Sequence, residues 1–401
     1  MTTTIQLTIA NGVQVVVPDS LNLITTYVLQ EQQDWFEDEI KFVRRLIKPG
    51  QKIIDIGANY GVYTLSMAHA VGETGYVWAF EPASSTAKLL TEGIAANGFQ
   101  DRVMLAQSAL SSQAGVAELS LNVNSELNAL LTTKDASCAS ETVTLVTLDE
   151  CMSRYQWRDI SFMKIDAEGE ESNILRGGRQ FFAEQSPLVL YEIKAGASLH
   201  LDLVKSFATL GYDSYRLVPG QNLLVPFDAE TAADDYLLNL FCCKEDRALQ
   251  LEAQGLLLRA APHALTFDSK KLTQFNWRHT LVKTPYGTQL AELWEQTVKA
   301  GNSTEVETAL SLYAISKDVS LSSSERFGAL KASFDLLKQL CEQDSSYLRL
   351  ASMARVARDY GERAIAVYAL QKLSTAIEKL KWMDPSEPFL APSQRFEIME
   401  T

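Results

Sequence analysis

The chain has 401 residues, of which 46% are hydrophobic and 21% are charged. A chain of this length and composition can bury a sizeable core, which excludes a disordered tail, a collagen-like chain and a small disulfide scaffold. The net charge is −14, and all of it comes from residues 1–245, which contain 31 acidic and 17 basic residues. Residues 246–401 contain 19 of each. The acidic part should therefore repel nucleic acid and anionic lipid.

Targeting signals and metal-binding patterns are missing from the sequence. No segment reaches the run of about 18 apolar residues that predicts a membrane-spanning helix. No Lys or Arg precedes Lys41, so the charged start of a signal peptide is absent. The five cysteines contain no C-x-x-C pair and are typical of reduced thiols. We expect a cytoplasmic protein without a transmembrane segment. The four histidines do not stand at metal-ligand spacing, and no metal site is predicted.

The first 50 residues predict a β-hairpin and a lead-in helix. Residues 5–17 alternate around Asn11-Gly12, a strong hairpin signal. Residues 27–47 carry apolar side chains at helical spacing, and Pro49-Gly50 ends that helix.

Strands and helices then alternate, which predicts a parallel, doubly wound sheet with helices on both faces. Strands are expected at residues 52–57, 76–81, 103–109, 162–165, 188–192 and 236–243, and helices at 63–70, 83–97, 171–182 and 200–210. Residues 111–148 interrupt this order, because two alternating segments flank a stretch rich in Ser, Asn and Thr. We interpret them as a hairpin insertion.

After Lys244 the sequence predicts helices alone. They are expected at residues 290–299, 305–315, 324–343, 347–360 and 362–381, and residues 351–368 are similar to one helical hairpin of tetratricopeptide type. The chain therefore divides into an N-terminal hairpin and lead-in helix at 1–48, a sheet domain at 49–245 and an all-helical domain at 246–401.

The strongest candidate binding site begins where the first sheet strand ends. Asp55-Ile-Gly-Ala-Asn-Tyr-Gly61 opens a helix, and its glycines allow a tight turn that a ligand can approach. Glu81 follows twenty residues later at the end of the next strand, where a carboxylate can accept both hydroxyls of a ribose. The charge of Asp55 suits a cationic ligand better than a pyrophosphate. Alternatively, the glycines only shape the turn.

Several motifs, taken together and in order, resemble the FkbM family of S-adenosylmethionine-dependent methyltransferases. They are residues 55–61 (DIGANYG), 80–82 (FEP), 146–150 (VTLDE), 164–171 (KIDAEGEE), 174–178 (ILRGG) and 187–192. The resemblance covers residues 40–195, with weaker support to 245. Ala167 and Glu170 depart mildly from the commoner Val and Ala of the family. The helical part lies outside the resemblance.

The resemblance implies an α/β fold with a Rossmann-like class I methyltransferase sheet, here joined to a small N-terminal β-hairpin region and a C-terminal all-helical domain. It implies S-adenosylmethionine as the cofactor and methylation of a hydroxyl on a sugar, glycan or secondary metabolite. The residues expected to bind the cofactor are Asp55, Gly57, Asn59, Gly61, Tyr63, Glu81 and Ser108.

Methyl transfer to a hydroxyl needs alignment and a base that takes the proton. Lys164, Asp166 and Glu168 alternate at the carboxyl end of a strand, so all three point to the same face while the chain stays extended. Glu192 ends the neighbouring strand. Carboxylates that converge in one cleft raise at least one pKa. We expect these four residues to be catalytic, with Asp166 as the base. Alternatively, Lys164 forms only a structural salt bridge, or the carboxylates hold a divalent cation.

Two other functions compete with methyl transfer. A nicotinamide-dependent oxidoreductase can use a similar sheet, but the G-x-G-x-x-G motif is missing. A non-catalytic methyltransferase-like core can also support a helical interaction module. The partners expected under the leading hypothesis are a small-molecule or glycan acceptor, and a second copy of the chain bound through the helical domain.

Overall fold

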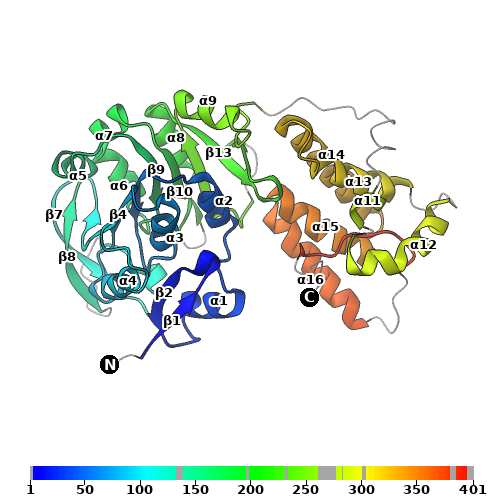
Figure 1. Cartoon of the computed structure of the whole chain (residues 1–401), viewed down its shortest axis with the longest axis horizontal. Helices are drawn as coiled ribbons and strands as arrows, with labels where there is room; N and C mark the ends of the chain where they lie inside the picture. Colours follow the sequence, from blue (N-terminus) through cyan, green and yellow to red (C-terminus); the bar gives the residue numbers. More distant parts are fainter. Residues whose placement is uncertain are drawn as a thin grey trace. The chain divides into compact units, whose positions relative to one another are not determined.

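The computed structural model describes residues 3–131, 139–195, 198–230, 234–260, 277–281, 283–299, 304–379 and 385–394. The chain forms two compact units (Figure 1). The sheet unit comprises Met1–Tyr215 and Leu238–Gln250, and the helical unit comprises Arg216–Leu237 and Leu251–Thr401. These limits differ from the predicted domain boundaries, because residues 216–237 are grouped with the helices and residues 1–48 with the sheet.

An eight-stranded sheet has the order β14-β13-β15-β10-β9-β3-β4-β5. Its strands are β3 (Lys52–Ile56), β4 (Tyr76–Phe80), β5 (Val103–Ala106), β9 (Ile160–Ile165), β10 (Leu188–Glu192), β13 (Asp213–Val218), β14 (Leu223–Pro226) and β15 (Asn239–Cys243). The five strands from β10 to β5 pair in parallel, as predicted. Their carboxyl ends therefore meet at one edge, where ligands of such sheets bind.

The sheet is mixed rather than wholly parallel, because β15 pairs antiparallel with both β10 and β13. In the described part of the chain no α-helix lies between β13 and β15. Parallel neighbours need a long crossover, whereas strands without one pair antiparallel. Strands β13 and β14 have no counterpart among the predicted elements.

The helices of the sheet unit include the predicted ones, two of which are broken, and two at residues 148–155 and 245–253 that are not among those predicted. They are α1 (Ile24–Gln32), α2 (Asp38–Leu46), α3 (Val62–Val71), α4 (Ser84–Ala96), α5 (Leu148–Tyr155), α6 (Glu171–Arg176), α7 (Arg179–Glu184), α8 (Asp202–Thr209) and α9 (Glu245–Ala253), the last of which continues into the helical unit. The single helix predicted over 27–47 is wrong: Gln33 ends α1 in the left-handed conformation, and a short linker leads to α2. The helix predicted over 171–182 is likewise divided at Gly177-Gly178.

Two small sheets complete the sheet unit besides the short pair β11 (Lys194–Ala195) and β12 (Ser198–Leu199). The predicted N-terminal hairpin is confirmed as β1 (Thr4–Thr8) paired antiparallel with β2 (Gln14–Pro18). The insertion contains the predicted hairpin, β7 (Gly115–Ser120) with β8 (Ser140–Val146). Strand β6 (Ala109–Leu110), directly before the insertion, pairs parallel with β8. The strand predicted over 103–109 is therefore two strands in different sheets. Cys138 lies outside the described residues.

The helical unit contains the helices that the sequence predicts after residue 284. They are α12 (Pro285–Lys299), α13 (Thr304–Ser316), α14 (Ser323–Gln343), α15 (Tyr347–Tyr360) and α16 (Arg363–Lys379), preceded by the short α11 (Arg278–Leu281). Their core includes the fully buried Trp277 and Trp294 and the side chains of β13 and β14 at Val218 and Leu223. Within the described ranges, no helix combines the length and apolar character needed to cross a membrane.

A segment without α-helix or strand at residues 385–394 packs on these helices. Leu390 is buried, and Phe389 stacks on Tyr286 with ring centroids 5.2 Å apart. The guanidinium of Arg349 donates to both carboxylate oxygens of Glu387, at 3.0 Å from Nε to Oε1 and 3.0 Å from Nη2 to Oε2. These contacts fix the segment as part of the helical core.

We expect Glu387→Gln to lower the free energy of unfolding of the helical unit by about 1 kcal/mol, because the charged, two-pronged contact with Arg349 is lost. Urea denaturation followed by circular dichroism measures the change. Glu378→Gln, at an exposed position of α16, is the matched control and should leave the midpoint unaltered. Equal midpoints for the two variants would show that the ion pair contributes nothing.

Candidate functional site

The turn between β3 and α3 requires its glycines. Gly57 has φ +77°, and a Cβ atom there would lie 1.7 Å from the backbone oxygen of Asp166. Gly61 has φ +89°, and a Cβ atom there would lie 2.3 Å from the side chain of Leu90. Asn59, between them, also has a positive φ of 49°, which Asn adopts more readily than most residues. The predicted tight turn is therefore present, and Gly57 brings it against the end of β9.

Glu81 holds this turn by its carboxylate. Oε2 accepts from the backbone N–H of Asn59 at 2.8 Å, and Oε1 accepts from the backbone N–H of Ala83 at 2.9 Å. Burial raises the pKa of Glu81 to about 7, and the two N–H donors oppose that rise. A carboxylate has about four acceptor positions, so each oxygen can still accept from a ligand hydroxyl.

Asp55 lies beneath the turn. It is fully buried, and its Oδ2 accepts from the hydroxyl of Thr64 at 2.5 Å. Its Oδ1 has no hydrogen-bond partner among the described residues. Burial raises the pKa of Asp55, and Lys164 lowers it. Because Asp55 does not line the cavity described next, it can act on a ligand only through its charge.

The turn, Glu81 and the end of β9 enclose one cavity of the sheet unit. The cavity has about 1020 Å³ of space, a figure that includes the solvent at its mouth. The polar and charged side chains that line it are Thr25, Glu37, Asn59, Tyr60, Tyr63, Glu81, Ser108, Ser125, Asn128, Lys164, Asp166, Glu168 and Glu170. Among the residues that line it, five are carboxylates and Lys164 is the sole cation. The cavity is therefore acidic.

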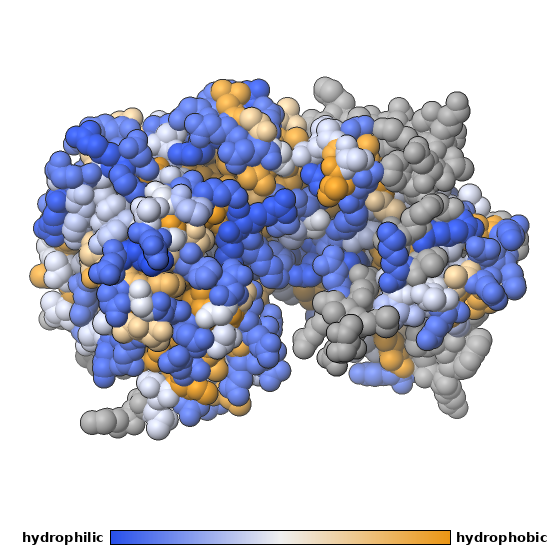
Figure 2. Space-filling model, viewed as in Figure 1, coloured by the Kyte–Doolittle hydropathy of each residue, from blue (hydrophilic) through white to orange (hydrophobic). Residues whose placement is uncertain are grey.

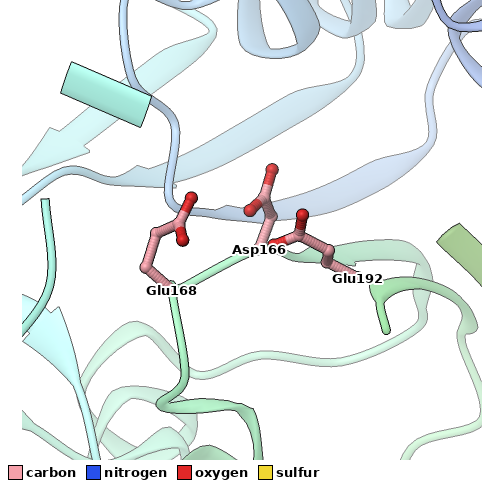
Figure 3. A group of neighbouring side chains, drawn as sticks. All are labelled: Asp166, Glu168 and Glu192. Carbon is pink, nitrogen blue, oxygen red and sulfur yellow. The ribbon is translucent and has the colours of Figure 1, made fainter. Parts of the chain in front are cut away.

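Three carboxylates gather beside the end of β9. Asp166, Glu168 and Glu192 each offer an oxygen within 4.8 Å of the others, and Figure 3 shows Asp166 between the other two. The carboxylates are half-buried, and Lys164, which is buried, donates to Asp166 Oδ2 at 2.7 Å. Burial, with Asp166 and Glu168 nearby, raises the pKa of Glu192 to about 10. Glu192 therefore keeps its proton at neutral pH. A divalent cation would displace that proton, and this oxygen set fits such an ion.

Most of the residues predicted for the site lie on the cavity wall. Gly57, Asn59, Tyr63, Glu81, Ser108, Lys164, Asp166 and Glu168 line it, whereas Asp55, Gly61 and Glu192 do not. The predicted reason for the grouping of Lys164, Asp166 and Glu168 is wrong. The chain does not stay extended, because β9 ends at Ile165 and Glu168 has φ +48°. A turn brings Glu168 back towards the same space.

Several residues of the wall have no counterpart in the sequence prediction. Glu37 comes from the linker between α1 and α2, and Ser125, Asn128 and Leu130 come from the insertion. Ser125 donates to Asn59 Oδ1 at 2.9 Å, which joins the insertion to the glycine turn. Residues 37–39 are all acidic and stand at the start of α2, a pattern that by itself indicates only a helix start.

Comparison with known proteins finds a family match within the sheet unit. Residues 55–214 match the model described as "Methyltransferase FkbM domain". A search of curated proteins finds no match.

Solved structures of low similarity include three methyltransferases. They are a SAM-dependent O-methyltransferase from Thermotoga maritima (15% identity, 60% of this chain and 77% of that chain, TM-score 0.30), an O-methyltransferase from Bacillus cereus in complex with SAH (12%, 57% and 93%, 0.32) and a SAM-dependent methyltransferase from Aquifex aeolicus (12%, 55% and 96%, 0.32). These similarities are too distant to indicate a reaction for this chain.

Proposed function

The chain carries an FkbM methyltransferase domain over residues 55–214, and from this premise we propose that it is an S-adenosylmethionine-dependent O-methyltransferase. The observation that carries the proposal is the acidic cavity between the glycine turn, Glu81 and the end of β9. Such a wall attracts a cation and repels a pyrophosphate. It favours a sulfonium cofactor over a nicotinamide dinucleotide.

The residues of the cavity fit this cofactor. S-adenosylmethionine, when bound, supplies an electrophilic methyl group on a positively charged sulfur. Glu81 would hold the ribose hydroxyls, and the backbone at Gly57 and Asn59 would face the ligand, while the missing Cβ of Gly57 lets the turn pack against the backbone of Asp166. Ser108 follows β5 at the same sheet edge, a position suited to the adenine. These four assignments use residues that line a single cavity.

Asp166 is the base of the proposed reaction. It accepts the proton of the acceptor hydroxyl, and Lys164, 2.7 Å away, balances the negative charge of its carboxylate. Glu192 is protonated at neutral pH and cannot take this role there. Glu168, on the same wall, would orient the acceptor. Alignment of acceptor and donor supplies most of the acceleration in a displacement of this kind.

Equilibrium binding tests the proposed cofactor. We expect calorimetry to detect binding of S-adenosylhomocysteine at micromolar concentration and no binding of NAD at a hundredfold higher concentration. Binding of NAD alone would favour the oxidoreductase. Binding of neither ligand would favour a non-catalytic core. Labelled-methyl transfer to paired sugar acceptors, one with a free hydroxyl and one with that hydroxyl blocked, then tests whether oxygen receives the methyl group.

A homodimer through the helical unit is the proposed assembly. Leu370 and Ile377 stand seven residues apart and so share a face of α16, where they are 44% and 48% exposed. On the face shown in Figure 2, hydrophilic residues dominate and hydrophobic ones form scattered patches. Light scattering should give the mass of two chains, and Leu370→Lys should reduce it to one. A wild-type mass of one chain would contradict this assembly.

A cytoplasmic location is proposed because the cysteines have the properties of reduced thiols. Cys151, Cys242 and Cys243 are free and buried, and burial raises the pKa of Cys151 to about 12. Such thiols stay reduced and unreactive at neutral pH. Fractionation of cells that produce the protein would test the location.

A further inference from the structure

The N-terminal segment, outside the matched domain, contributes an acidic side chain to the cavity. Glu37 lies in the linker between α1 and α2 and lines the cavity wall. The linker is held in place, because Arg44 of α2 donates to both carboxylate oxygens of Asp34, at 2.7 and 2.8 Å, and to the hydroxyl of Ser66 in α3 at 3.0 Å. The position of Glu37 is therefore fixed by contacts on both sides of the linker.

Glu37 makes the first of three contacts that lead to Asp166. The hydroxyl of Tyr63 donates to Glu37 Oε2 at 2.7 Å. Lys164 Nζ lies 5.0 Å from the centroid of the Tyr63 ring, within the range of a cation–π contact. Lys164 Nζ in turn donates to Asp166 Oδ2 at 2.7 Å. Tyr63 and Lys164 are both buried, at 6% and 5% exposed, so solvent reaches only a small part of either side chain.

We propose that Glu37 is a positioning residue for methyl transfer, which fixes the Tyr63 ring by a hydrogen bond and thereby holds Lys164 against Asp166. This inference rests on the proposed function. Without that hydrogen bond the ring can rotate, and the buried ammonium of Lys164 loses one of its fixed neighbours. A small displacement of a reacting group is costly, because a shift of about 1 Å can reduce a rate by 10²-fold.

The charges around Glu37 determine its pKa, and hence whether its carboxyl group is protonated at neutral pH. Burial and Glu39 raise the pKa of Glu37 to about 7, while Tyr63 and Lys164 lower it and Asp166 raises it slightly. Glu37 is therefore partly protonated at neutral pH. Both of its forms retain an oxygen that accepts from the Tyr63 hydroxyl, so the positioning role does not need the charge.

Three variants separate positioning from proton transfer. Glu37→Ala removes the acceptor, Tyr63→Phe removes the donor but keeps the ring, and Glu37→Gln keeps an acceptor oxygen and cannot take a proton. We expect Glu37→Ala and Tyr63→Phe each to lower kcat by about 10- to 100-fold with KM for S-adenosylmethionine changed less than threefold. Glu37→Gln should keep at least a third of the wild-type kcat. Glu31→Ala, an exposed acidic position of α1, is the matched control.

A double-mutant cycle tests whether the two residues act as one. The double variant Glu37→Ala/Tyr63→Phe should lose no more activity than either single variant, because both remove the same hydrogen bond. The unfolding midpoints of the ligand-free variants should be non-additive in the same way.

The outcomes distinguish this inference from the proposed function. A wild-type protein that binds no S-adenosylhomocysteine and transfers no methyl group overturns the proposed function, and the positioning role with it. An active wild type combined with full activity of Glu37→Ala overturns the positioning role alone. If Glu37→Gln is as inactive as Glu37→Ala, Glu37 acts by proton transfer or charge, and the inference is equally overturned.

Discussion

Asp166→Asn is expected to lower turnover by roughly 10²–10⁴, because it keeps the shape of the side chain and removes its capacity to take a proton. Affinity for S-adenosylhomocysteine should change little. In the wild-type protein Lys164 Nζ lies 2.7 Å from Asp166 Oδ2, and the amide oxygen of Asn can still accept a hydrogen bond from it. Lys164 also retains the nearby negative charge of Asp55. The variant should therefore fold, and its unfolding midpoint verifies this.

Glu192→Gln is the matched control for that loss. Glu192 carries its proton at neutral pH, so its carboxyl group has one donor and one acceptor oxygen. The amide of Gln also has both a donor and an acceptor, and therefore replaces this group more closely than it would replace an ionised carboxylate. We expect turnover at pH 7 within a fewfold of wild type. Single-turnover methyl transfer should be measured for both variants and for Glu168→Gln. Near-full activity of Asp166→Asn, combined with an inactive Glu192→Gln or Glu168→Gln, would assign the base to a different carboxylate.

The parts of the site that the sequence predicts are those that local geometry determines. Gly57 and Gly61 lie in a turn where a side chain would collide with Asp166 or Leu90, so the residue type itself reports the conformation. Glu81 directly follows β4, and parallel strands bring such positions to one edge of the sheet. Periodicity and turn chemistry therefore suffice to place this half of the cavity.

The other half depends on contacts between distant parts of the chain. Glu37 reaches the cavity only because Gln33 ends α1 in the left-handed conformation, whereas helical periodicity runs across that position. Ser125 reaches it through a hydrogen bond to Asn59, 66 positions earlier in the sequence. No periodic pattern or fixed spacing in the sequence predicts either contact. The antiparallel pairing of β15 could not be predicted either, because the residue pattern that predicts a strand does not specify whether it runs parallel or antiparallel to its neighbour.

Glu81→Ala is expected to weaken binding of S-adenosylmethionine by about 2–4 kcal/mol, which is about 30- to 700-fold in Kd, because two hydrogen bonds from ligand hydroxyls to a buried carboxylate are lost. Part of the loss has a second origin. The backbone N–H groups of Asn59 and Ala83 lose their acceptor as well, so the turn itself is less firmly held. Glu81→Gln keeps one acceptor oxygen and should show an intermediate affinity.

The pH dependence of binding tests whether the ionised carboxylate of Glu81 contributes to it. Burial raises the pKa of Glu81 to about 7, and the ligand hydroxyls donate best to the ionised form. Wild-type affinity should therefore be constant above about pH 8 and fall by up to tenfold per pH unit below pH 7. Glu81→Ala should lose most of this dependence and keep only the part due to Glu37, whose pKa burial also raises to about 7. Glu73→Ala, at an exposed acidic position of the same unit, should retain it in full. Calorimetry between pH 5.5 and 8.5 provides the comparison. An unchanged dissociation constant in Glu81→Ala, or an equal pH dependence in all three proteins, would place the ribose away from Glu81.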